Sequence, residues 1–147
     1  MKRMFSLTVI ILSFISASSF GSDSFTISGS VNFRGKGDLY ICLFNLEQYT
    51  EFQRPGYELS QSPCKSIKMN DELRKVKTVS FEFENIPAGT YTIVSYRDVN
   101  FNGKVDFATL IKEPWATYKE KDPIVSPTWN LIKFDLKENL SDIKIQM

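Results

Sequence analysis

A run of oxygen-bearing side chains at alternate positions is the part of this sequence best suited to chemistry. The run reads Asp98-Val99-Asn100-Phe101-Asn102-Gly103-Lys104-Val105-Asp106. Calcium loops of the EF-hand type place oxygen ligands at positions 1, 3, 5, 7 and 9 and a glycine at position 6. On that pattern the predicted metal ligands are the side chains of Asp98, Asn100, Asn102 and Asp106 and the backbone carbonyl of Lys104. The spacing therefore predicts a site for one structural Ca²⁺ ion.

The pattern is incomplete at its twelfth position, where such loops carry a bidentate carboxylate. This chain has Thr109 there, so Glu113, Asp122 or water would have to complete the shell. With two formal charges facing the ion, we expect weak binding, on the order of 10⁻⁴ to 10⁻³ M. The alternative is an Asx-rich turn that needs no metal and places Gly103 in the left-handed conformation. The residues leave both interpretations open.

Large aromatic residues gather around an irregular stretch, 112–127, that contains three prolines. Trp115 and Tyr118, with Trp129 just beyond, would stack on a sugar ring or a peptide side chain if they lay exposed on a loop. We therefore predict Trp115 and Tyr118 as ligand-binding residues for a glycan or a peptide. Because large aromatic residues are mostly buried in folded proteins, the alternative is that these rings cap the core.

Groups for catalysis are scarce. The chain has no histidine, which removes the usual general base, the usual zinc ligand and every Ser-His or Cys-His nucleophile. No phosphate-binding glycine loop, HExxH, GxSxG or CxxC motif occurs. Glu82 and Glu84 alternate with apolar residues, so they are expected on the outer face of a strand and not as an acid–base pair. The sequence therefore predicts no catalytic residues and no enzyme activity.

The first residues have the pattern of an export signal. Met1-Lys2-Arg3 is positively charged, 4–15 is an apolar run, and 17–21 is small and polar, which predicts cleavage after Gly21. The apolar run is too short to span a bilayer, and no second span follows it. We expect a periplasmic or secreted protein with one domain over 22–147.

The charge balance and the expected compartment further limit the possible partners and the expected state of the cysteines. Loss of Lys2 and Arg3 from the 18 basic residues leaves 16 against 17 acidic ones, so neither a nucleic-acid surface nor a polybasic membrane patch is expected. The only two cysteines are Cys42 and Cys64. In an oxidising compartment they are expected to form a structural disulfide, with a reactive thiol pair as the alternative.

Short segments that alternate apolar and polar residues make up most of the remaining sequence, as half-buried strands do. Strands are expected over 25–33, 39–44, 64–69, 79–83, 91–96, 129–136 and 143–147, with a short extension over 107–111. Turns are expected at 34–38, 70–72 and 85–90, and a long excursion with one helical turn over 45–63. Seven or eight short strands predict an all-β fold, a single antiparallel immunoglobulin-like β-sandwich.

Two neighbouring motifs point to a known family. Phe83-Glu84-Asn85-Ile86-Pro87-Ala88-Gly89-Thr90-Tyr91 and the Asp98–Asp106 loop together resemble the uncharacterised family of exported bacterial proteins called domain of unknown function 2141. The similarity covers about 31–147. The resemblance implies a transthyretin-like sandwich, similar to Cna-B-type modules, in which Tyr91 packs in the core. It implies no established activity.

Two positions differ from the family pattern. Arg97 stands where the family usually has histidine, and the segment 109–113 keeps only Glu113 of the usual Gly-Ile-Pro-Lys-Glu. The sequence as a whole predicts an exported, non-enzymatic module with a calcium loop and a binding or structural role in the envelope. Its partner would be a macromolecule or a glycan. The alternative is a carbohydrate- or peptide-binding module that uses Trp115 and Tyr118.

Overall fold

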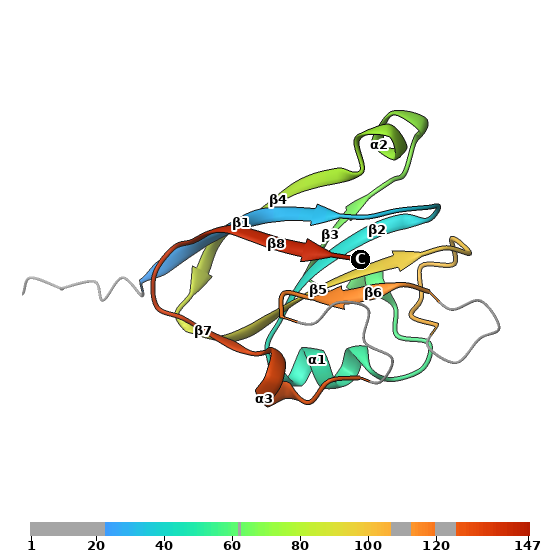
Figure 1. Cartoon of the computed structure of the whole chain (residues 1–147). Coiled ribbons are helices and arrows are strands. Elements are labelled where there is room, and N and C mark those ends of the chain that lie inside the picture. The colour runs from blue at the N-terminus through green and yellow to red at the C-terminus, as the bar shows by residue number, and fades with distance from the viewer. Residues whose placement is uncertain (1–22, 62, 107–112, 120–125) are drawn as a thin grey trace, which may run out of the picture.

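The computed structural model describes residues 23–61, 63–106, 113–119 and 126–147, which fold as two β-sheets packed face to face (Figure 1). The predicted all-β sandwich is confirmed. The predicted signal segment 1–21, the expected strand extension 107–111 and Asp122 lie outside the described residues. No helix in the described part of the chain is long and apolar enough to cross a membrane.

One sheet has three strands in the order β4 (Thr78–Pro87), β1 (Ser24–Asn32) and β8 (Leu140–Gln146). Its core-facing residues alternate with polar ones, because successive side chains of a strand point to opposite faces. β1 pairs antiparallel with β4 but parallel with β8. The prediction of a purely antiparallel sandwich is therefore wrong at this one pairing.

The other sheet has the order β3 (Cys64–Ile67), β2 (Asp38–Phe44), β5 (Gly89–Asp98) and β6 (Trp115–Thr117), and β7 (Phe134–Leu136) also pairs with β5. Every residue of β2 is buried. The three-stranded sheet covers one face, and a layer containing the helix α1 (Leu46–Phe52) covers the other (Figure 1). Burial on both faces explains why this strand reads as a continuous apolar run.

Two hydrophobic clusters result, and β5 separates them. Ile93 belongs to the cluster between the sheets, whereas Val94 and Tyr96 belong to an aromatic cluster under α1. Tyr91, on the same face as Ile93, packs partly buried against the first cluster. Odd-numbered residues of β5 therefore face the three-stranded sheet, and even-numbered ones face the helical layer.

The predicted disulfide is present. Cys42 and Cys64 lie directly opposite each other on β2 and β3, with their Cα atoms 4.0 Å apart. The bond joins residues 22 positions apart and anchors the short edge strand β3 to the central strand β2. A crosslink of this span stabilises a fold chiefly by restricting its unfolded chain.

Three local predictions are corrected by the structure. The segment 70–72 is no turn but the N-cap and first turn of α2 (Asp71–Val76), because the Asn70 side chain accepts the Leu73 N–H. Most of 85–90 is strand, with Ala88 alone between β4 and β5. The expected strand 129–136 divides into α3 (Trp129–Ile132) and β7. The excursion after β2 holds α1 and the short 3₁₀ helix η1 (Leu59–Gln61).

Candidate functional site

The Asp98–Asp106 loop begins where β5 ends and is held by a second segment of the chain. The Gly103 carbonyl accepts the Leu59 N–H at 3.0 Å, and the Val105 N–H donates to the Tyr57 carbonyl at 2.9 Å. Val105 is fully buried in the aromatic cluster. The loop is therefore anchored through its backbone and through one apolar side chain.

The Asp98 carboxylate forms hydrogen bonds with the backbone of its own loop. It accepts the Gly103 N–H at 2.7 Å and the Asn102 N–H at 3.2 Å, and the residue is only 1% exposed. Gly103 has φ +73°, the left-handed conformation that glycine adopts most readily. The first position of the predicted pattern is thus bonded to the fifth and sixth positions.

Asn100 and Asn102 form two successive Asx turns. The Oδ1 of Asn100 accepts the Asn102 N–H at 3.1 Å, and the Oδ1 of Asn102 accepts the Lys104 N–H at 2.8 Å. Both amide groups then donate from Nδ2 to one atom, the Oδ2 of Asp106, at 2.8 and 2.7 Å. The structure therefore brings together the side chains of Asn100, Asn102 and Asp106, while the Asp98 carboxylate binds the backbone of the same loop.

A buried carboxylate braces the loop from behind. Glu113 is 2% exposed, and its Oε1 accepts the Val99 N–H at 2.8 Å and the Asn100 N–H at 3.3 Å. Its Oε2 accepts a hydrogen bond from the hydroxyl of Tyr96. Glu113 therefore supports the loop backbone, and no hydrogen bond among the described residues joins it to the side chain of a predicted metal ligand.

Tyr96 is the site residue that sequence reasoning missed. Its hydroxyl donates to Glu113, accepts the Asp106 N–H at 2.8 Å and lies 3.4 Å from the Lys104 carbonyl. Burial, followed by the hydrogen bond to Glu113, raises the pKa of Tyr96 well above its usual value. The two-residue period of the strand could have identified Tyr96 as a site residue, because it puts Tyr96 on the same face of β5 as Asp98.

The donor chemistry of the loop fits a hard cation, although the structure shows these atoms bonded to one another. Among the described residues, no group of three or more His, Cys, Asp or Glu side chains is close enough to hold a metal ion. The loop instead offers two carboxylates, two amide oxygens and the Lys104 carbonyl. Both Asp98 oxygens and the Oδ1 atoms of the two asparagines each accept one hydrogen bond and keep a second lone pair, whereas Oδ2 of Asp106 accepts two.

The aromatic residues predicted to bind a ligand lie elsewhere. Trp115, in β6, is 4% exposed, and its ring centroid is 5.9 Å from that of Phe52. Tyr118 is partly buried, with its ring edge-on to Phe134 at 5.7 Å. This arrangement leaves no exposed stacking platform at Trp115, and capping of the core describes its position.

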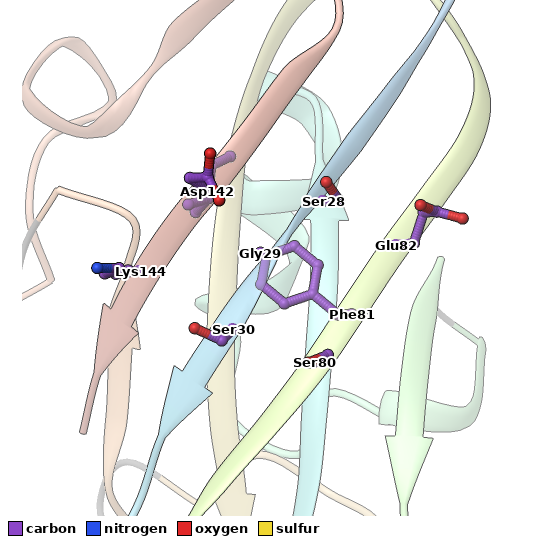
Figure 2. A pocket seen from close by; sticks show the side chains of 9 residues that line it. Ser28, Gly29, Ser30, Ser80, Phe81, Glu82, Asp142 and Lys144 are labelled. Carbon is purple, nitrogen blue, oxygen red and sulfur yellow. The ribbon is translucent and has the colours of Figure 1, made fainter.

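A shallow hollow of about 570 Å³ lies on the outer face of the three-stranded sheet, away from the loop. Figure 2 shows Ser28 and Ser30 of β1 on its floor, between Glu82 of β4 and the residues Asp142 and Lys144 of β8. Small hydroxyls between charges of both signs are typical of a hydrated sheet surface. The loop is therefore the candidate functional site.

Comparison with protein families finds a match that spans the sandwich and this loop. Residues 19–144 match the family model described as "Uncharacterized protein conserved in bacteria (DUF2141)". The chain belongs to this family. The DUF2141 match includes both the Pro87-Ala88-Gly89 connection and the whole Asp98–Asp106 loop. Searches of curated proteins and of solved structures find no match to this DUF2141 protein.

Proposed function

We propose that this DUF2141 protein is an exported, non-enzymatic module whose Asp98–Asp106 loop binds one calcium ion, and that it has a binding or structural role in the cell envelope. The observation that supports the calcium site most directly is the convergence of Asn100 and Asn102 on a single oxygen of Asp106. That convergence places two side chains from alternate positions around one carboxylate oxygen, and turning both amides over would bring their oxygens to the same point, as a calcium shell requires.

The ion would replace contacts that the loop now makes within itself. Rotation of the Asn100 and Asn102 amides away from Asp106 frees the Oδ2 atom that both of them now contact. Asp98 and Asp106 then supply two negative charges against the two positive charges of the ion. Because affinity rises with ligand charge and rigidity, this donor set supports binding on the order of 10⁻⁴ to 10⁻³ M.

The donor set favours calcium over other common divalent ions. Carboxylate, amide and carbonyl oxygens suit calcium, which tolerates varied coordination geometry, whereas magnesium demands a near-ideal octahedron. Zinc and copper prefer imidazole or thiolate ligands. The chain has no histidine, and both of its cysteines are in the disulfide.

Calcium binding would make the loop more rigid and thereby also restrain Glu113 and Pro114, which contact the loop and the end of β5. Glu113 contacts the loop backbone at Val99, and the next residue, Pro114, accepts the Arg97 N–H at 2.9 Å. A cation that fixes the loop would therefore also hold Glu113 and Pro114, which directly precede β6. This coupling is compatible with a structural role for the ion and needs no catalytic step.

Isothermal titration of the protein without its predicted signal segment tests the proposal. We expect one ion per chain, a dissociation constant on the order of 10⁻⁴ to 10⁻³ M and weaker magnesium binding. Asp106→Asn should abolish the calcium heat, whereas Asp135→Asn on the distant strand β7 should leave it unchanged. Absence of a calcium heat in the wild-type protein would overturn the proposed function.

A further inference from the structure

Arg97 occupies an unusual place for a charged residue. It shares the inner face of β5 with Ile93, so it lies at the end of the sandwich on the side that faces the three-stranded sheet. The side chain is half-buried, and its Nε is buried without a hydrogen-bond partner among the described residues. Such a group in a native structure calls for a physical explanation, because leaving it unpaired is unfavourable.

No carboxylate neutralises this guanidinium within the described part of the chain. The ion pairs found there are Arg54–Glu51, Lys68–Asp38, Arg74–Asp71 and Lys104–Glu58. Burial alone lowers the pKa of the Arg97 guanidinium, but arginine still remains charged at neutral pH. Among the described residues, this partly desolvated positive charge has no counter-charge.

The two acidic residues closest to Arg97 along the strands form hydrogen bonds with other groups. Asp38 and Asp98 are paired in register on β2 and β5. The Asp38 carboxylate accepts Lys68 Nζ at 2.6 Å and the Met69 N–H at 3.1 Å. The Asp98 carboxylate accepts N–H groups of its own loop. Both carboxylates therefore bind groups other than the Arg97 guanidinium.

The turn between β1 and β2 lies against the guanidinium of Arg97. A Cβ atom on Gly35 would lie 3.0 Å from Nη1 of Arg97, and Gly35 has φ +99°, so a larger residue would crowd the group and strain the turn. Arg34 and Lys36 flank Gly35 and are exposed. Among the described residues, the N–H groups of Gly35 and Lys36 donate no backbone hydrogen bond.

We propose that Arg97 and the Arg34–Gly37 turn form a binding site for an oxyanion, a carboxylate or a phosphate group of a small ligand. One edge of the planar guanidinium carries Nε and Nη2, so a single such group can accept hydrogen bonds from both atoms and give the buried Nε its partner. Arg34 and Lys36 add positive potential at the entrance. This site uses none of the predicted metal ligands.

NMR spectroscopy of the Arg97 side chain gives a direct test. The wild-type protein, in buffer freed of divalent cations on a chelating resin, is titrated separately with phosphate and acetate against chloride at constant ionic strength. We expect one of the two anions to shift the Arg97 Nε–H resonance to saturation. A shift with phosphate assigns a tetrahedral oxyanion, and a shift with acetate assigns a carboxylate.

Variants separate recognition from general charge. Arg97→Gln should weaken binding at least tenfold, and Arg97→Lys should weaken it severalfold, because lysine keeps the charge but loses the planar pair of donors. The control Arg54→Gln removes an exposed charge on the other side of β5 and should leave binding unchanged. If neither anion moves the Arg97 resonance in the wild-type protein, the proposal is overturned, whether or not the variants fold.

Discussion

The hydroxyl of Tyr96 donates a hydrogen bond to the carboxylate of Glu113, 17 residues further along the chain and inside the protein. The same hydroxyl accepts the Asp106 N–H, while the other oxygen of Glu113 accepts the Val99 N–H. One phenol and one carboxylate therefore tie both ends of the loop to the end of β5. The predicted metal ligands depend on this pair for their placement.

Replacement of Glu113 by glutamine should destabilise the protein. The variant keeps the size of the side chain but loses a charged acceptor for buried N–H and O–H donors. Hydrogen bonds to charged groups contribute about 1.5–3 kcal/mol, and we expect a loss of that order in urea unfolding. Glu84→Gln on the exposed face of β4 is the matched control and should change stability by less than about 0.5 kcal/mol. Equal stabilities of the two variants would contradict the bracing role.

Replacement of Asn102 by aspartate should lower the stability of the calcium-free protein but raise its affinity for calcium. Without calcium, the new carboxylate loses its hydrogen bond to Asp106 and faces a like charge, so the free energy of unfolding should fall by about 1 kcal/mol. With calcium, the third charge should tighten binding about tenfold, since ligand charge tunes affinity.

The control for this charge change is Asn130→Asp on the exposed surface of α3, which should alter neither quantity. Calorimetric titration measures the affinity, and urea unfolding in calcium-free buffer measures the stability. A fall in calcium affinity in Asn102→Asp would argue against a site that Asp98, Asn102 and Asp106 share.

Burial of Tyr49 predicts a defined response to alkaline pH. Its hydroxyl donates to the Pro127 carbonyl at 3.0 Å, and burial raises the pKa of Tyr49 above its usual value. The folded state then keeps the proton more tightly than the unfolded state, so stability is complete below pH of about 10 and falls above it. Tyr49→Phe should be less stable at neutral pH but lose less stability between neutral and alkaline pH. Identical slopes in urea unfolding across that range would contradict this prediction.

Removal of the disulfide should weaken the fold without changing the loop. For a crosslink of 22 residues the chain-entropy relation gives a contribution of roughly 3 kcal/mol. The double variant Cys42→Ala, Cys64→Ala should lose about that amount of unfolding free energy and should equal the reduced wild-type protein within about 1 kcal/mol. Unchanged stability on reduction would show that pairing of β2 and β3 alone holds this edge.

Much of the fold follows from local patterns in the sequence. Alternation of Val79, Phe81 and Phe83 with polar residues placed β4, and the unbroken apolar run Leu39–Phe44 placed the doubly covered strand β2. The alternate oxygens of the loop predicted which side chains would meet. These features depend only on neighbouring residues, and strand period and turn chemistry determine them.

What the sequence did not predict depends on contacts between distant segments. The parallel pairing of β1 with β8 joins the two ends of the domain and has no local signature. Trp129 lies at the start of a helix, and its ring packs against Tyr49 of α1 with the ring centroids 5.9 Å apart. The bracing role of Glu113 likewise requires the chain to return to β5, which no spacing rule near Asp98 reveals.

The central claim, that the Asp98–Asp106 loop binds calcium, is tested most directly by a calcium titration followed in ¹⁵N–¹H NMR spectra. The Gly103 N–H, which donates to Asp98 at 2.7 Å, and the Lys104 N–H, which donates to Asn102 at 2.8 Å, report on the loop itself. We predict saturable shifts of these two resonances with a dissociation constant on the order of 10⁻⁴ to 10⁻³ M, and none in Asp106→Asn. Unchanged Gly103 and Lys104 resonances at saturating calcium would contradict the claim.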